Sequence, residues 1–331
     1  MAQIASEPIL GPEQAGPEVG GEPSGQVVGR SPGQLFWRRF RRDKFALAGI
    51  VFVVFMIFVA TVGAPLVANM TGHPPNDTSH LREATNELGL PIGPSSDFWF
   101  GADTAGRDVF VRVAYGARTS LSVALVATSI ALVIGVSLGL LAGFYRGKVD
   151  TFVSRLIDIV LSLPILLLSL GLVAACSLTE NGCLGGFLKP GVLLVAYVIG
   201  LFSWPYIARI VRGQVLSLRE KEFIEAARAQ GAHDGRIMFR EVLPNVVAPI
   251  IVYTTLIIPN NILFEAALSF LGIGVKPSTP SWGKMLAEAS TIFTYAWWMM
   301  VFPGVFLFLT TMAFNLVGDG LRDALDPRTA R

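Results

Sequence analysis

Charge is scarce in this chain. Charged side chains make up only 15% of its 331 residues, whereas hydrophobic residues make up 52%. An ordinary soluble domain carries more charge and fewer apolar residues than this. A signal peptide is also lacking, because the first residues are mostly Gly, Pro and Glu rather than an apolar run behind a basic start. The composition therefore argues against a soluble domain, and we expect a membrane protein whose first apolar segment is retained as an anchor.

Signatures of catalysis are missing as well. The three histidines (His73, His80 and His233) are scattered, and no His, Cys and carboxylate cluster has the spacing of metal ligands. The string nearest to a phosphate-binding loop, Gly143–Val149, has the wrong spacing and ends in Val. A Gly-x-Ser-x-Gly nucleophile elbow is absent too. We therefore expect that the chain is not an enzyme and holds no cofactor, so that any ATP chemistry belongs to another chain.

Six apolar segments are present that reach the roughly 20 residues needed to cross a ~30 Å hydrocarbon core. Soluble proteins rarely bury six helices that lack a polar face. The sequence therefore predicts an all-α polytopic membrane protein with six transmembrane helices. Prolines interrupt spans three to six, either as breaks that free backbone groups to line a cavity or as kinks that neighbouring helices accommodate: Pro164, Pro205, Pro249, Pro259 and Pro303. The predicted spans are Phe45–Val67, Thr119–Tyr145, Ile159–Thr179, Pro190–Ala208, Val242–Phe264 and Ala296–Val317.

The basic residues predict the orientation, because cytoplasmic loops hold an excess of Lys and Arg. With the N-terminus inside, 19 of the 26 Lys and Arg residues fall on the cytoplasmic side and seven outside. We therefore expect a multi-pass protein of the cell (inner, or cytoplasmic) membrane with both chain ends in the cytoplasm.

The chain divides into five predicted segments. Because large apolar residues are almost absent from residues 1–34, this segment is expected to be a disordered cytoplasmic tail. In the next segment, Phe36–Arg42 interleaves aromatic residues with arginines, which suits a helix in the headgroup layer that orients the first span, with a regulatory role as the alternative. The other segments are the first transmembrane helix with its basic start (35–67), an external loop (68–118), a transmembrane domain of five helices (119–321) and a cytoplasmic C-terminal tail (322–331).

The only two cysteines, Cys176 and Cys183, fall in the second predicted external loop. Outside the cytoplasmic membrane a disulfide persists, and the Asn181-Gly182 turn between the cysteines would let it close. Two free thiols at a helix end are the alternative. Both remain open at this point, since spacing alone does not determine the geometry.

A charged segment lies between the fourth and fifth predicted spans. Residues 218–230 are good helix formers with close pairs of opposite charge, and Gly231 follows where a helix end favours a left-handed residue. A second helix is expected to start near Asp234, whose carboxylate would cap it, and Pro244 is expected to stop or kink it. Two short helices joined at a glycine form a compact projection, here called the knob (residues 219–245), in which Ala226 and Ala227 keep the first helix slim.

At these residues the chain resembles a known family. Glu225-Ala226-Ala227, three further residues, Gly231 and the later Leu243-Pro244 resemble the EAA motif of permease subunits in binding-protein-dependent ABC importers. The resemblance extends from about Phe36 to Arg328, and five more stretches are similar to the dipeptide/oligopeptide (nickel) permease C-type group. These stretches are Phe100–Phe110, Tyr115–Arg118, Glu265–Gly272, Pro280–Gly283 and Gly318–Pro327.

The resemblance implies a fold and a set of partners. The fold would be the type I ABC importer transmembrane fold, with the knob as the coupling helix that docks on a cytoplasmic ATPase. The expected partners are a second, B-type permease subunit, two ABC ATPase subunits that bind ATP and Mg, an extracellular or periplasmic substrate-binding protein and membrane lipid, with no nucleic acid. Glu225 would pair with a basic residue of the ATPase, Gly231 would shape the turn, and Ile237, Met238 and Phe239 would fill an apolar groove.

The expected function is ATP-driven import of di- or oligopeptides. Import of nickel or another small solute by the same architecture is the first alternative, and a secondary transporter or a membrane scaffold without an ATPase are others. Glu265, near the outer end of the fifth span, is the ionisable residue of most interest at membrane depth. It is expected to line the path, to contact the partner permease, or to reach the interface in a purely structural role.

Overall fold

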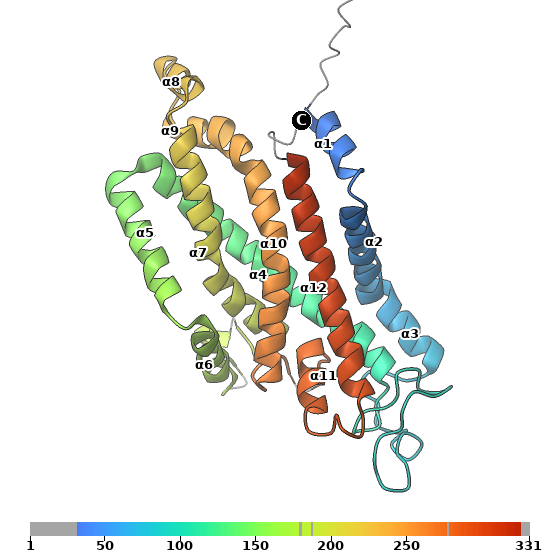
Figure 1. Ribbon diagram of the computed structural model, residues 1–331. Coiled ribbons are helices and arrows are strands. Elements are labelled where there is room, and N and C mark those ends of the chain that lie inside the picture. The colour runs from blue at the N-terminus through green and yellow to red at the C-terminus, as the bar shows by residue number, and fades with distance from the viewer. Residues whose placement is uncertain (1–31, 179–180, 187, 277, 326–331) are drawn as a thin grey trace, which may run out of the picture.

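The computed structural model describes residues 32–178, 181–186, 188–276 and 278–325, and these residues form a bundle of long helices (Figure 1). The predicted disordered tail lies outside the described residues, apart from residues 32–34, which begin helix α1 (Pro32–Phe40). The last helix, α12 (Trp298–Leu325), extends into the predicted C-terminal tail, and residues 326–331 lie outside the description.

Within the described residues, five helical runs are long and apolar enough to cross a membrane. The first joins α2 (Lys44–Phe58), a π turn (Val59–Gly63) and α3 (Ala64–Thr71). The second is α4 (Val109–Tyr145), the third is α7 (Val192–Leu218), and the fifth is α12. The fourth runs from Asp234 to Phe270 and ends in α10 (Leu243–Phe270). Most of these runs are longer than the predicted spans. The predicted spans end where polar residues begin, but a helix can continue past the hydrocarbon layer and carry polar residues outside it.

A bent pair of helices brings the number of crossings to six when the pair is counted as one span. Helices α5 (Gly147–Ser162) and α6 (Ile165–Ser177) pass the length and hydropathy test only together, and they meet at an angle of 84°. Of the two predicted alternatives, the break applies at Pro164, whereas the other four prolines lie inside continuous helices: Pro205, Pro249, Pro259 and Pro303. The predicted start of this span at Ile159 is wrong. Leu163 has an extended backbone with ψ 145°, as expected for a residue that precedes proline.

The second span also starts earlier than predicted. Helix α4 begins at Val109 rather than Thr119, because Asp108 caps it: its Oδ1 accepts hydrogen bonds from the backbone N–H groups of Phe110 (2.8 Å) and Val111 (3.4 Å). The first long loop therefore covers residues 72–108. It lies at one end of the bundle together with the short helix α11 (Trp282–Ala289), and we call this end the α11 end (Figure 1).

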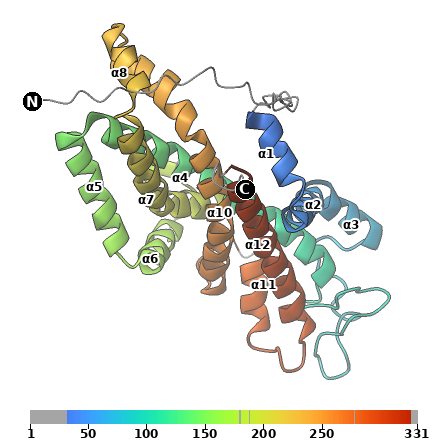
Figure 2. The same cartoon turned by 45° about the horizontal axis from the view of Figure 1, so that its top comes forward.

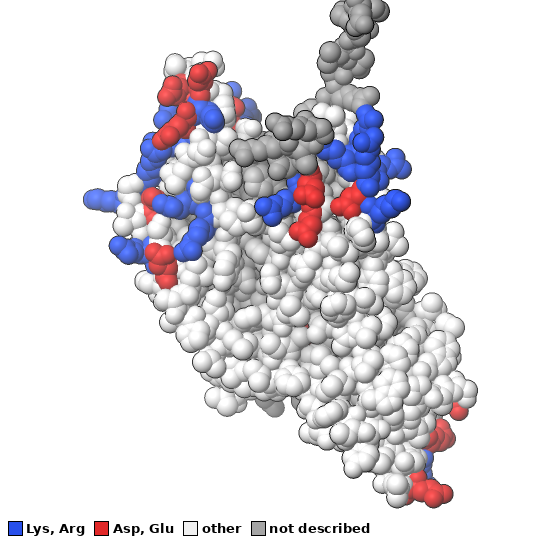
Figure 3. All heavy atoms as spheres, viewed as in Figure 1, with Lys and Arg blue, Asp and Glu red and all other residues white. Residues whose placement is uncertain are grey.

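The opposite end, the α8 end, bears helix α8 (Glu222–Ala229) and both ends of the described chain, as Figures 1 and 2 show. An even number of crossings puts both ends of a chain on the same side of a membrane, so this placement agrees with six spans. On the face shown in Figure 3, Lys and Arg side chains gather at the α8 end, and the middle of the bundle is almost free of charge.

Helices α4 and α7 cross closely, and this crossing carries the base of the knob. Gly135, Gly139 and Gly143 face α7 at intervals of four residues, and a Cβ atom at Gly139 would stand only 2.6 Å from the carbonyl oxygen of Ala208. Small residues at this spacing let two helix backbones approach in a membrane. The C-terminal half of α7 is therefore held firmly against α4 up to the point where the knob begins.

Candidate functional site

The knob projects beyond the bundle at the α8 end (Figures 1 and 2). Its first helix is shorter than predicted: α7 continues to Leu218, residues 219–221 form a turn, and α8 covers only Glu222–Ala229. The predicted left-handed residue is confirmed, because Gly231 has φ +80°. Its N–H donates to the carbonyl of Arg228 (2.9 Å), and that of Ala232 donates to Ala227 (3.1 Å), the pair of bonds that closes a Schellman turn.

The second helix starts at Asp234, as predicted, but its capping residue differs from the prediction. The cap of α9 (Asp234–Arg236) is His233, whose Nδ1 accepts a hydrogen bond from the backbone N–H of Arg236 (3.2 Å), and Asp234 is the first helical residue. A π turn follows (Ile237–Val242), and the helix continues into α10 without a stop at Pro244. Pro244 lies in the first turn of α10, where proline is tolerated, and Figure 1 shows the run curving there.

The knob has an apolar core that belongs to this chain. Ile224 of α8 packs against Ile237, Met238 and Val242, and the same cluster continues to Phe144 at the end of α4. The prediction that Ile237 and Met238 fill a partner's groove is therefore wrong: both side chains are buried internally, because α8 has one apolar face that needs a partner. Phe239 stays on the surface with 63% of its area exposed. Phe223 of α8, which the sequence analysis did not single out, is 40% exposed.

Charged side chains fasten the base of the knob to the corner between α4 and α5. Arg219 donates to the carbonyl oxygen of Phe144, and its guanidinium lies 5.9 Å from the centre of the Phe144 ring. Arg228 lies 5.7 Å from the same ring, a second cation–π contact. Arg146 pairs with Glu220, and this hydrogen bond and charge lower the pKa of Glu220. Burial lowers the pKa of Arg219, and the neighbouring cations lower it further. These contacts make α8 move with the bundle.

The outer face of the knob is exposed and mixed in charge. Glu225, Ala226, Gly231 and Pro244 are exposed, while Ala227 is partly buried against the core. Acidic and basic side chains share this surface in Figure 3. Within the residues that the structure describes, no group of three or more His, Cys, Asp and Glu side chains could hold a metal ion. The arrangement provides a contact surface.

Glu265 lies in the interior of the chain and not at the membrane interface, and its contacts within this chain agree with the structural role among the three predicted alternatives. Its side chain is fully buried, its Oε2 accepts a hydrogen bond from the Ser120 hydroxyl (2.7 Å), and its Oε1 accepts one from Ser269 (2.7 Å). Gly283 at the start of α11 covers this region so closely that a Cβ there would stand 2.3 Å from the carbonyl oxygen of Ala266. Glu265 therefore joins α4 to α10 beneath α11, which could not be foreseen without knowing that these helices meet.

Cys176 and Cys183 form a disulfide at the α11 end. The bridge closes the short loop after α6, and Cys176 itself is buried against Val173 and Leu194. Of the two alternatives that the sequence left open, the structure has the bridge rather than free thiols.

We expect neither cysteine to react with an alkylating reagent in unreduced, detergent-denatured protein, and both to react after reduction. The reason is that both sulfurs are held in the bridge. Mass spectrometry of the peptides that contain the cysteines measures the labelling. The Cys176→Ser variant is the control, since it frees Cys183 for labelling without reductant. Labelling of the unreduced wild-type chain would contradict the bridge.

Comparison with known proteins places this geometry in a family. The model of the binding-protein-dependent transport system inner membrane component matches residues 135–331, and that of the N-terminal TM domain of oligopeptide transport permease C matches residues 31–86. The dipeptide transport system permease protein DppC of Alkalihalophilus pseudofirmus is 39% identical, over 98% of this chain and 97% of its own. The glutathione transport system permease protein GsiD of Escherichia coli O157:H7 is 42% identical, over 90% of this chain and 91% of its own.

Solved structures share the fold. The inward-facing MetNI methionine ABC transporter matches with a TM-score of 0.53 and 21% identity, over 65% of this chain and 96% of the matched chain. This likeness confirms the predicted fold class, the helical transmembrane fold of type I ABC importers. The described residues form five membrane-crossing runs, or six when the bent pair counts as one, and the knob lies between α7 and α10.

Proposed function

Because the chain belongs to the family of binding-protein-dependent transport system inner membrane components, we propose that it is the permease subunit of an ATP-driven importer of short peptides. Members of this family are multi-pass inner membrane components of transport systems and not themselves the catalysts. The observation that carries the proposal is the knob, a projection with its own apolar core that leads directly into two membrane-crossing runs, α7 and α10.

The knob and both chain ends lie in the cytoplasm in this proposal. The basic side chains of α1, the α4–α5 corner and the knob gather at the α8 end (Figure 3), and cytoplasmic segments carry such an excess. The α11 end, with the 72–108 loop and the disulfide, then faces outward, where a disulfide persists.

As a transport component, the chain needs other subunits that supply energy and deliver the substrate, and these are its proposed partners. They are a second, B-type permease, two cytoplasmic ATPase subunits that bind ATP and Mg, and an external substrate-binding protein. On the knob, Glu225 pairs with a basic residue of the ATPase, and Ala226 permits its close approach. The apolar groove of the ATPase, which Ile237 and Met238 were predicted to fill, instead takes Phe239 and Phe223. These two phenylalanines are the large apolar side chains of the knob that stay exposed.

Transport works by alternating access in this proposal. When two ATPases close on ATP, they move the knob, and the knob transmits the movement because its base is fastened to α4 and α5 by the contacts of Arg219, Arg228 and Arg146. Since α7 and α10 continue directly from the knob, they change their packing together, and the path opens to the other side.

Peptides are the proposed cargo, because the similar permeases named above belong to dipeptide and glutathione transport systems. The test is reconstitution of the chain in proteoliposomes with the second permease, the ATPases and the binding protein. ATP-dependent uptake of a labelled dipeptide is the expected result. Uptake of nickel but not of the dipeptide would mean that the cargo is nickel rather than a peptide. Uptake by this chain without an ATPase would point to a secondary transporter.

A further inference from the structure

Two adjoining cavities follow one face of α10 through the bundle. The larger, of about 740 Å³, lies between α6, α7 and α10, and the smaller, of about 330 Å³, lies towards the α8 end. They share Tyr253 and Leu256, so the two cavities adjoin along α10, and we call them together the groove. The lining residues of α7 recur about once per helical turn, so one face of that helix lines the groove. These residues are Ser203, Tyr206, Ile210 and Gln214.

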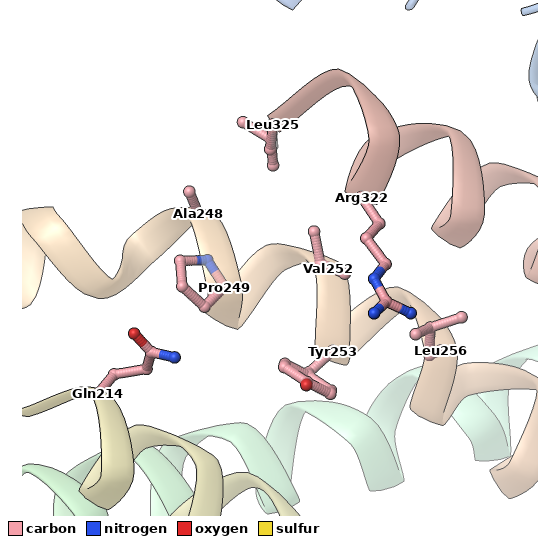
Figure 4. A pocket seen from close by; sticks show the side chains of 8 residues that line it. All are labelled: Gln214, Ala248, Pro249, Val252, Tyr253, Leu256, Arg322 and Leu325. Carbon is pink, nitrogen blue, oxygen red and sulfur yellow. The ribbon is translucent and has the colours of Figure 1, made fainter. Parts of the chain in front are cut away.

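Three polar side chains from three different helices line the smaller cavity, and Figure 4 shows Gln214 set apart from the other two. They are Gln214 of α7, Tyr253 of α10 and Arg322 of α12. The rest of the lining is apolar and includes Pro249 and Val252. Figure 4 shows the Arg322 guanidinium directed towards α10, close to Tyr253, rather than away from the bundle.

All three residues are exposed, with 39% of the area of Tyr253 accessible, so a ligand can reach their side chains. Among the described residues, none of them takes part in a side-chain hydrogen bond or an ion pair. The acidic residues next to Arg322 on α12, Asp319 and Asp323, do not line the cavity. A guanidinium over an apolar lining with no carboxylate facing it is a site that favours an anion.

The chemistry of the site selects a carboxylate. Arg offers a planar fork of N–H donors that matches the two oxygens of a carboxylate, and the Gln214 amide and Tyr253 hydroxyl add donors from the other two helices. A space of about 330 Å³ is at the small end of ligand pockets, so it suits the last residue of a short peptide rather than a long chain.

We propose that Arg322, with Gln214 and Tyr253, binds the C-terminal carboxylate of a peptide at the α8 end of the groove. This inference rests on the proposed peptide transport and adds a specificity rule: peptides with a free C-terminal carboxylate bind better than their C-terminal amides. Arg322 recognises the substrate, whereas the knob supplies the movement.

The test measures binding of the dipeptide Ala-Phe and of its C-terminal amide to the assembled transporter in nanodiscs, without ATP or the binding protein. Arg322→Gln should weaken Ala-Phe binding about ten-fold, the usual effect of losing a charge-assisted hydrogen bond, and leave binding of the amide unchanged. Arg322→Lys keeps the charge but loses the fork, so it should weaken Ala-Phe binding less. Arg42→Gln is the matched control, because Arg42 is an exposed arginine at the same end and outside the groove.

Equal binding of Ala-Phe by wild type and Arg322→Gln would overturn the inference, and so would an equal loss of binding for Ala-Phe and its amide. Uptake of Ala-Phe into proteoliposomes by the wild-type transporter separates this failure from failure of the proposed function. If wild type imports the dipeptide but Arg322→Gln binds it normally, peptide transport stands and the carboxylate site does not.

Discussion

Replacing Gly231 by Val should reduce ATP-dependent import about ten-fold while the chain still inserts in the membrane. Gly231 has φ +80°, and a left-handed backbone costs an L-residue about 1–2 kcal/mol, more for a β-branched one. A Cβ there meets no atom within 4 Å, so the effect comes from the backbone and not from a clash. The Schellman turn should open, which changes the direction of α8 and with it the surface offered to the ATPase.

The measurements are uptake into proteoliposomes and the ATPase activity stimulated by the binding protein. Gly235→Val is the matched control, because Gly235 lies in α9 without a positive φ and a Cβ there also meets open space. Gly231→Asn should retain more activity than Gly231→Val, since Asn tolerates the left-handed region. Glu225→Ala should uncouple hydrolysis from transport in the same way, by removing a charged contact. Normal transport by both Gly231→Val and Glu225→Ala would disprove the docking role of the knob.

Features encoded locally could be predicted from the sequence. Apolar runs identify the spans because hydropathy alone decides what can cross a bilayer, and the left-handed turn follows from Gly231 at a helix end. The break at Pro164 has an equally local cause. The resemblance of Glu225-Ala226-Ala227 added the identity of the knob, which no local rule contains.

Features that depend on neighbours far along the chain were not predictable. Ile237 and Met238 are apolar and near an aqueous end, so a partner's groove and an internal core explain them equally well until α8 is seen to lie over them. Glu265 appears isolated in the sequence because its partner Ser120 comes from another helix, 145 residues away. Arg322 looked like one more basic residue of a tail, and its cavity is visible only when α7, α10 and α12 are placed together.

Arg112 is the residue at the α11 end whose loss should destabilise the protein most. It was predicted to lie in an external loop, but it belongs to α4 and only 1% of its side chain is exposed. Its guanidinium donates to Glu288 of α11 (3.1 Å) and lies 3.3 Å from Asp103 of the 72–108 loop. Arg107 contacts the same two carboxylates, at 2.6 Å to Asp103 and 3.1 Å to Glu288. Two arginines and two carboxylates thus tie three separate elements together.

The Arg112→Leu variant should therefore lower the free energy of unfolding by about 3 kcal/mol, because removing one partner of a buried ion pair leaves uncompensated charge. Thermal unfolding in detergent, followed by tryptophan fluorescence, measures the loss. Arg118→Leu is the matched control, since Arg118 is an exposed arginine of the same helix. Glu288→Gln should cost less in the Arg112→Leu background than alone, because it removes part of the unbalanced negative charge. An Arg112→Leu variant as stable as Arg118→Leu would mean that Arg107 alone suffices to hold the loop and α11 to the bundle.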